Sequence, residues 1–251
     1  MSIALTQTAA LRNRLLTGLP HEQYEGLFSN LIKGSLNSHQ ILYDAGDDIR
    51  CAYFINDGMA SLMSISSEGN SIEVGNVGNE GMVGIPVLLR HVTTPHHVVV
   101  QIPGEALVVS TDILRQEFDK EGELRNRLLS YTHALGTYMS QLGVCNHFHT
   151  VDKRLCRWLL ISSLQVQSQS FHLTHESLAQ VLGTSRTGVT MAANKLQRAG
   201  LIQYHRGQIT ILNHTALEAT CCDCYQITKE VFDHLSAPDF APTPSHRYVN
   251  K

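Results

Sequence analysis

The fold of this chain is decided by residues 171–212, which read FHLTHESLAQVLGTSRTGVTMAANKLQRAGLIQYHRGQITIL. Thr174 is suited to cap the start of a helix, and Gly183 is suited to end it, because glycine tolerates the left-handed backbone of a helix C-terminus. After the short turn Gly183–Ser185, a second helix is predicted from Arg186 to Ala199. The apolar residues at inward-facing positions are Leu178, Ala179 and Leu182 in the first helix and Val189, Ala193 and Leu196 in the second. Two short helices joined by a tight turn form a helix-turn-helix.

A short β-rich hairpin follows the second helix. The runs 201–204 and 208–212 flank His205-Arg206-Gly207, so we expect a two-stranded wing with a basic tip. In a helix-turn-helix, the outer face at the start of the second helix meets the base edges of DNA. A helical pair that serves packing alone is the alternative. Packing, however, requires neither small polar residues at the start of the second helix nor an arginine at a hairpin tip, so the pattern favours DNA binding.

The composition of the 251-residue chain is that of a globular protein, with 43% hydrophobic and 16% charged residues and a formal net charge of −3. The sequence has no run of apolar residues long enough to span a membrane, and its N-terminus lacks the order of a signal peptide. We therefore expect a cytoplasmic protein without a membrane partner. Three of the six cysteines crowd into Cys221, Cys222 and Cys224, which is unlike a disulfide framework, so we expect reduced thiols.

Charge is distributed unevenly along the chain. Residues 1–118 carry 6 Lys/Arg against 12 Asp/Glu, a balance of −6, whereas residues 150–212 carry 7 Lys/Arg against 2 Asp/Glu, a balance of +5. Attraction to phosphates is screened within roughly 10 Å, so an acidic protein can bind nucleic acid through one basic module. A solvated charged face is the alternative. The basic segment coincides with the helix-turn-helix.

The first half of the chain reads as short β-rich runs separated by turn signals, from about Leu36 to Ser110. Turns are predicted at Asn56-Asp57-Gly58, at Glu68-Gly69-Asn70 and at Pro103-Gly104, because these residues favour tight hairpins. This pattern predicts an antiparallel barrel or roll. A short helix is predicted before it, from Gln23 to Ile32.

A long helix is predicted between the two halves. Its apolar residues are spaced alternately by four and three positions over three heptads: Leu124, Leu128, Tyr131, Leu135, Tyr138, Leu142 and Cys145. Such a seam favours a parallel homodimer with these residues at the interface, and the alternative is the buried stripe of a helix within one chain. A further helix is predicted from Arg154 to Leu164, apolar on one face and basic on the other.

The predicted fold class is α+β. It comprises an N-terminal antiparallel β-roll of the cyclic-nucleotide-binding-like (jelly-roll) type, a long dimerisation helix and a C-terminal winged helix-turn-helix. The predicted domain bounds are 1–118 for the sensor roll, 119–149 for the dimerisation helix, 150–235 for the DNA-binding domain, and 236–251 for a flexible tail. The tail is predicted because Pro238, Pro242 and Pro244 stand among few large apolar residues.

The stretch LTHESLAQVLGTSRTGVTMAANKLQRAGLI (173–202) resembles the pattern of the Crp/Fnr superfamily of bacterial transcription regulators. The shared features are a threonine at the start of the first helix, Ala-x-x-Leu-Gly into the turn, Ser-Arg at the start of the second helix and Gly-Leu-Ile at its end. The resemblance covers about residues 20–235. It implies a dimeric protein that binds palindromic double-stranded DNA, and it implies RNA polymerase as a partner.

The resemblance also implies roles for individual residues. Those expected to touch phosphates are Thr174, His175, Gln180, Thr184, Ser185 and, in the wing, Arg206. Arg186 would reach guanine in the major groove, with Thr187 and Thr190 beside it. Where the best-known members carry a base-reading glutamate and arginine, this sequence has Thr187 and Met191, so we expect a different operator.

In the sensor half, the ligand residues of the cyclic-AMP-binding relatives are replaced. Ile85 takes the place of their ribose-binding glutamate and Pro95 that of their phosphate-binding arginine, so we expect no regulation by cyclic AMP. The residues predicted to line an effector pocket in the roll are Gly84, Ile85, Arg90 and His96.

The cysteines do not match the iron–sulfur pattern of the oxygen-sensing relatives, whose ligands lie close together near the N-terminus, because Cys51 is the first cysteine and stands alone. One helical stripe is predicted to contain Leu217, Cys221, Cys224, Thr228, Val231 and Leu235. Cys221 and Cys224 are therefore expected to be small buried residues, and no metal site is predicted. Metal or redox use of the clustered thiols, and haem or metal binding by His96-His97 or by His147 and His149, are the alternatives.

The sequence thus predicts a homodimeric, sequence-specific DNA-binding transcription regulator. The alternative is a sensor of a small molecule, haem, metal or redox state whose helix-turn-helix serves mainly protein contacts. We find no P-loop, nucleophile-elbow or zinc-protease motif, so we expect no enzymatic activity.

Overall fold

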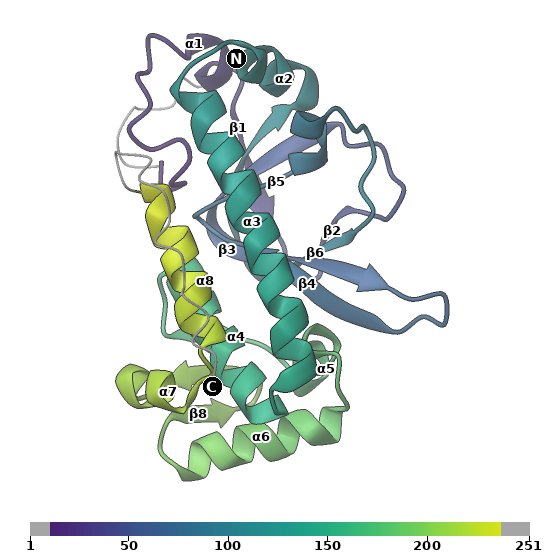
Figure 1. The fold of residues 1–251 in the computed structure, drawn as a ribbon, viewed down its shortest axis with the longest axis vertical. Helices are drawn as coiled ribbons and strands as arrows, with labels where there is room; N and C mark the ends of the chain where they lie inside the picture. The colour runs from purple at the N-terminus through teal and green to yellow at the C-terminus, as the bar shows by residue number, and fades with distance from the viewer. Residues whose placement is uncertain (1–10, 237–251) are drawn as a thin grey trace, which may run out of the picture.

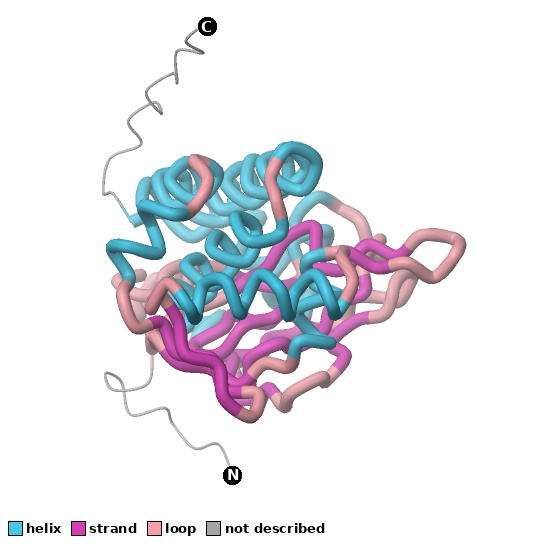
Figure 2. The backbone as a smooth tube through the Cα atoms, turned by 90° about the horizontal axis from the view of Figure 1, so that it is seen from below, coloured by secondary structure: helices cyan, strands magenta, loops and turns pink. Residues whose placement is uncertain are grey.

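The computed structural model describes residues 11–236 and shows an α+β fold (Figure 1). Its N-terminal half is a six-stranded antiparallel sheet with the strands β1 (Ile32–Leu36), β2 (Ile41–Tyr43), β3 (Cys51–Ile65), β4 (Ser71–Val77), β5 (Met82–Val83) and β6 (His97–Ser110). The strand order is β1-β6-β3-β4, with β2 paired to β6 and β5 to β3. The predicted roll is therefore confirmed. Figure 2 shows the strands gathered on one side and most helices on the other.

Two of the predicted turns are wrong, because β3 and β6 are each one long strand. Asn56-Asp57-Gly58 lies within β3, at a point where its register with β6 shifts. Gly58 has a φ of +83°, and a Cβ there would lie 2.6 Å from the carbonyl oxygen of Ile102. The Asp-Gly pair and the facing Pro103-Gly104 thus form bulges, which use the same positive-φ chemistry as a turn. The turn at Glu68-Gly69-Asn70 is confirmed between β3 and β4.

The predicted helix at Gln23–Ile32 is shorter than expected. The helix α1 covers only Glu25–Phe28, and Ile32 already begins β1. The short 3₁₀ helix η1 (Ile85–Leu89) precedes β6, and α2 (Thr111–Asp119) follows it. Leu27 and Leu114 from these helices belong to the core that fills the roll.

The long helix is confirmed as α3 (Glu123–Phe148), but the seven seam residues do not face outward. All of them, from Leu124 to Cys145, are buried within the single chain, with at most 6% of the surface of each exposed. The helix packs against β4 and against α8 (Cys224–Asp233), which runs beside it (Figure 1). The predicted dimer interface at this seam is therefore wrong. A fully buried side chain has no surface to offer a second copy, so the seam is the buried stripe of one chain.

The C-terminal half contains the helices α4 (Val151–Val166), α5 (His175–Leu182), α6 (Arg186–Arg198), α7 (His214–Thr220) and α8, followed by the 3₁₀ turn η2 (His234–Ser236). A three-stranded sheet in the order β7-β9-β8 accompanies them, formed by β7 (Ser170–His172), β8 (Ile202–His205) and β9 (Gln208–Ile211). The winged helix-turn-helix is therefore confirmed. The third strand, β7, was not predicted.

Two further expectations about this half are wrong. The predicted basic face of Arg154–Leu164 is not solvated, because Arg154 and Arg157 are both buried. The stripe from Leu217 to Leu235 is not one helix, because the chain breaks at Cys221–Asp223 between α7 and α8. From residue 237 onward, the predicted tail lies outside the residues that the structure describes. Within residues 11–236, no helix combines the length and apolar composition that crossing a bilayer requires.

Candidate nucleic-acid interface

The two helices of the helix-turn-helix begin with side-chain caps. Thr174 Oγ1 accepts a hydrogen bond from the backbone N–H of Ser177 at 3.0 Å, and Ser185 Oγ accepts one from Gly188 at 3.1 Å. Gly183 ends α5 with a φ of +54°, as the sequence predicts. The six inward-facing apolar residues of the two helices are all buried. The caps and the turn fix the angle at which α6 leaves α5.

The helix α6 lies across the lower end of the molecule in Figure 1, away from α1 and α2. Its outer face carries Arg186, Thr187 and Met191, and Met191 is 69% exposed although it is apolar. An arginine can pair with guanine, and an apolar side chain can contact the thymine methyl group. The sequence reasoning missed Asn194, which is exposed three residues after Met191 on the same face and carries an amide suited to adenine.

His175 and Thr190, two of the predicted DNA contacts, lie side by side between α5 and α6. His175 Nδ1 lies 2.9 Å from Thr190 Oγ1, and its ring stacks on Tyr204 at 4.2 Å between centroids. Burial and then the charge of Arg186 lower the pKa of His175, and its Nε2 is also buried. His175 therefore joins α5, α6 and β8 as a neutral ring.

Gln180, Thr184 and Arg206 are three of the residues predicted to touch phosphates. Gln180 is exposed, Thr184 is half-buried in the turn, and Arg206 stands at the exposed wing tip with a φ of +48°. Gly207 completes that turn at a φ of +82°, where a Cβ would lie 2.8 Å from Nε2 of His172. The wing is held against β7 because β9 pairs with that strand.

The basic charge of this surface is smaller than the sequence count implies. Because Arg154 and Arg157 are buried, they cannot meet phosphates. Lys195 Nζ lies 2.5 Å from Asp152 Oδ2, and this ion pair lowers the pKa of Asp152. The exposed basic residues that remain are Lys153, Arg186, Lys195, Arg198 and Arg206.

The four residues predicted to line an effector pocket have different surroundings in the roll. A Cβ on Gly84 would lie 3.3 Å from that of Ala52 and 3.4 Å from the hydroxyl of Tyr43, so the backbone is closely covered there. Ile85 is buried. Arg90 points to the surface, where its Nη2 pairs with Asp119 at 2.8 Å.

His96 is the fourth of these residues, and it is partly buried before β6. Burial lowers its pKa, and its Nδ1 has no hydrogen-bond partner among residues 11–236.

A buried polar network that the sequence did not predict joins the roll to α4. Trp158 Nε1 donates to Glu73 Oε1 at 3.1 Å, and the Ser61 hydroxyl donates to the same carboxylate. Gln165 Nε2 donates to Asn76 Oδ1 at 2.9 Å, which also accepts from the hydroxyl of Tyr138 on α3 at 3.1 Å. Burial raises the pKa of Glu73 to about 7.

The structure also brings together Cys145, His149, Cys222 and Cys224, which the sequence reasoning treated separately. The signal that was available is the spacing of Cys145 and His149, four residues apart at the end of a predicted helix. Such a pair shares one helix face. Nothing local to the sequence, however, indicates that the Cys222–Cys224 segment returns to that face.

Solved structures similar to this chain include regulators of the CRP family. FixK2 from Bradyrhizobium japonicum has a TM-score of 0.66 at 14% identity, with 76% of this chain and 98% of that one covered. The regulator TTHB099 of the CRP family from Thermus thermophilus has a TM-score of 0.61 at 18% identity, with 74% and 95% covered. At these identities the likeness shows the fold.

Similarity also extends to sequence families and curated relatives. The chain is 22% identical over 185 residues to the global nitrogen regulator of Synechococcus elongatus, covering 70% of this chain and 83% of that protein. The same regulator from Nostoc is 21% identical over 214 residues, covering 80% and 93%. Residues 33–121 match the family model of the cyclic nucleotide-binding domain, and residues 153–220 match that of the Crp-like helix-turn-helix domain. Since the two matches span more than half of the chain in this order, the protein is a DNA-binding transcription regulator of the Crp/Fnr superfamily.

Proposed function

We propose that the protein binds a specific palindromic DNA site as a homodimer, with α6 in the major groove and the wing on the adjacent backbone. The observation that carries this proposal is the exposed start of α6, where Arg186, Thr187 and Met191 face outward on a capped and tightly packed frame. In a dimer of this kind, two such helices meet half-sites one helical turn apart. Arg198 and Arg206 add phosphate attraction beside them.

The exposed face of α3, rather than the buried seam, supports a dimer. Leu129 and Val144 are 44% and 45% exposed, and Gly136 and Gly143 have open space where a Cβ would be. Exposed apolar side chains separated by glycines allow two helices to approach closely. We propose that a second copy of α3 packs on this face and sets the distance between the two α6 helices.

The effector is not cyclic AMP in this proposal. A cyclic phosphodiester needs a buried cation. Arg90, the arginine predicted for the pocket, is instead turned to the surface toward Asp119.

The protein has no catalytic role in this proposal and acts in the cytoplasm, where its DNA lies. RNA polymerase is the further partner that the resemblance implies. The second candidate function is a sensor whose helix-turn-helix binds another protein.

The test is selection of binding sites from a random duplex library by the purified protein without added ligand. An enriched palindrome with half-sites about one turn apart supports the proposal and shows that the protein is active without an effector. Affinity for that site should fall steeply with salt, because Lys and Arg release counterions from phosphates. If folded, dimeric protein enriches no sequence, either alone or with lysate metabolites, the second candidate function is favoured.

A further inference from the structure

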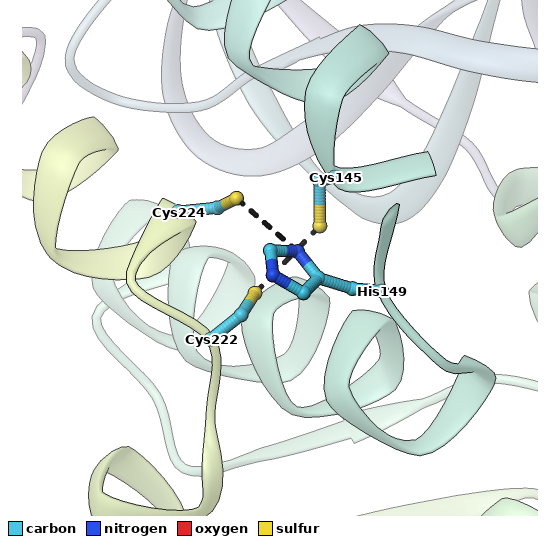
Figure 3. Close-up of side chains that lie close together, drawn as sticks. All are labelled: Cys145, His149, Cys222 and Cys224. Carbon is cyan, nitrogen blue, oxygen red and sulfur yellow. Dashed lines mark hydrogen bonds between the residues drawn. The ribbon is translucent and has the colours of Figure 1, made fainter. Parts of the chain in front are cut away.

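Four metal-ligating side chains converge where the long helix ends (Figure 3). Cys145 lies in the last turn of α3, and His149 is the residue that caps this helix. Cys222 and Cys224 come from the break between α7 and α8, where the chain turns back toward α3. Their ligand atoms all lie within 4.8 Å of one another, and the three sulfur atoms are buried.

Two of the distances between ligand atoms match the edges of a tetrahedral zinc site. Zinc binds thiolate at about 2.3 Å and imidazole at about 2.0–2.1 Å, so a tetrahedron has S–S edges of about 3.8 Å and S–N edges of about 3.6 Å. Here Cys145 Sγ lies 3.7 Å from Cys222 Sγ, and Cys224 Sγ lies 3.5 Å from His149 Nδ1. Three cysteines and one histidine are a common ligand set for structural zinc.

The groups around the four ligands also fit a metal. Gln141 Nε2 donates to Cys224 Sγ at 3.1 Å, which suits a thiolate. His149 Nε2 lies 3.8 Å from Asp223 Oδ1, so a carboxylate faces the nitrogen that is turned away from the sulfurs. Such carboxylate–histidine pairs orient metal ligands. The buried guanidinium of Arg157 lies close to Cys145.

Cys221 is separated from this arrangement although it is the neighbour of Cys222. Its Sγ is 3.9 Å from the backbone oxygen of Lys153, and it is not one of the four converging residues. The geometry therefore distinguishes two adjacent cysteines that the sequence alone cannot tell apart. This distinction provides an internal control.

We propose that Cys145, His149, Cys222 and Cys224 bind one Zn²⁺ ion. The metal joins the end of α3 to the α7–α8 connection, immediately beside Thr150, where α3 gives way to the first helix of the DNA-binding half. It holds the orientation of the DNA-binding half relative to the long helix. Three thiolates and Zn²⁺ carry a net charge of −1, which the buried guanidinium of Arg157 offsets.

The compact ligand set favours one metal ion over other uses of these thiols. In a four-iron cluster each cysteine binds a different iron atom, so the sulfurs stand further apart than around a single ion. A disulfide requires sulfur atoms about 2.0 Å apart, well below the 3.7 Å between Cys145 and Cys222.

The first experiment uses elemental mass spectrometry to measure the metal content of untagged full-length protein purified under reducing conditions. We expect one zinc per chain in the wild type and in C221S, and loss of zinc in C222S and C145S. C156S, at a buried cysteine outside the cluster, is the matched control for the effect of a core Cys→Ser change. Loss of zinc from C221S but not from C222S would overturn the ligand assignment.

A second measurement uses the wild type and does not depend on how the variants fold. After zinc is removed with a chelator, titration with Co²⁺ should give the visible ligand-field bands of tetrahedral cobalt and thiolate-to-cobalt charge transfer at one equivalent. Zinc should raise the melting temperature by about 10 °C. Iron with broad visible absorbance, a Cys145–Cys222 disulfide in protein free of metal, or folded protein that binds neither Zn²⁺ nor Co²⁺ would each overturn the proposal.

Discussion

Glu73 is a carboxylic acid at the centre of the contact between the roll and α4, and it determines how that contact responds to pH. Burial raises its pKa from 4.5 to about 7, although the Ser61 hydroxyl, the charge of Arg157 and the Trp158 N–H lower it. The folded state therefore binds this proton more tightly than the unfolded state. The stabilisation is complete below the unfolded pKa and is lost as the pH rises through the folded pKa.

We predict that the free energy of unfolding falls by up to about 3 kcal/mol between pH 4.5 and pH 7 because of this group. The variant E73Q keeps a polar side chain of the same size, so its free energy of unfolding should depend less steeply on pH. Burial also raises the pKa of Glu80, which should supply part of the remaining pH dependence. Chemical denaturation at several pH values measures this. E68Q, in the exposed β3–β4 turn, should keep the wild-type slope, and equal slopes for E73Q and E68Q would contradict the prediction.

Arg186 stands at the first position of α6, where a side chain can enter the major groove. R186A should weaken binding to the selected operator by about 1–3 kcal/mol and weaken binding to random DNA much less, because a bidentate contact to guanine is specific to sequence. Fluorescence anisotropy with both duplexes measures the two losses. R198A, at the exposed C-terminal end of the same helix, should reduce both affinities alike. An equal loss on both duplexes for R186A would make Arg186 a phosphate contact.

At the scale of the element, α3 has an exposed face and a buried face, and mutations on the two should have different effects. Val144 lies on the exposed face proposed for the dimer, so V144D should give a folded monomer that binds DNA weakly. Leu135 is buried within the chain, so L135D should destabilise the fold by more than about 4 kcal/mol. Sedimentation velocity and thermal melting separate the two effects. A V144D protein that remains dimeric would place the interface elsewhere.

The elements that sequence could predict are those whose signals are local. The helix-turn-helix was predicted because caps, turn glycine and inward-facing residues lie within one short stretch. The role of the α3 seam could not be predicted, because alternating spacings of three and four residues are typical both of a coiled coil and of a stripe buried within one chain. Likewise, Asp57-Gly58 permits a bulge as readily as a turn. Cys145 and Cys222 are 77 positions apart, so only the folded chain shows that they meet.

At the scale of the whole molecule, the DNA-binding half is docked on the roll through both polar and close apolar contacts. The Trp158–Glu73 and Gln165–Asn76 hydrogen bonds hold α4, while α5 meets β4. Tyr138 brings α3 into the same network. A change in the roll can therefore reach α6 through groups that all three parts share. Such coupling between the roll and α6 requires that the two halves are docked in this way in solution. The contact between Gly183 and Ile72 allows this docking to be tested.

Gly183 ends α5 with positive φ, and a Cβ there would lie 2.6 Å from Cδ1 of Ile72 on β4. G183A should therefore destabilise the protein by about 1 kcal/mol through backbone strain and by a further amount through the clash. In the I72A background the clash is relieved and only the strain remains, so the double-mutant cycle should give a coupling energy above about 0.5 kcal/mol. Denaturant unfolding of the four proteins measures it.

The matched control is G200A, since Gly200 also has positive φ, at +70°, but has open space where its Cβ would lie. It should show the strain alone and no coupling to I72A. If G183A and G200A behave alike in both backgrounds, the turn of the helix-turn-helix does not rest on the β3–β4 hairpin in solution. The roll would then influence α6 through α3 and α4, by way of the Trp158–Glu73 hydrogen bond and the junction at Thr150.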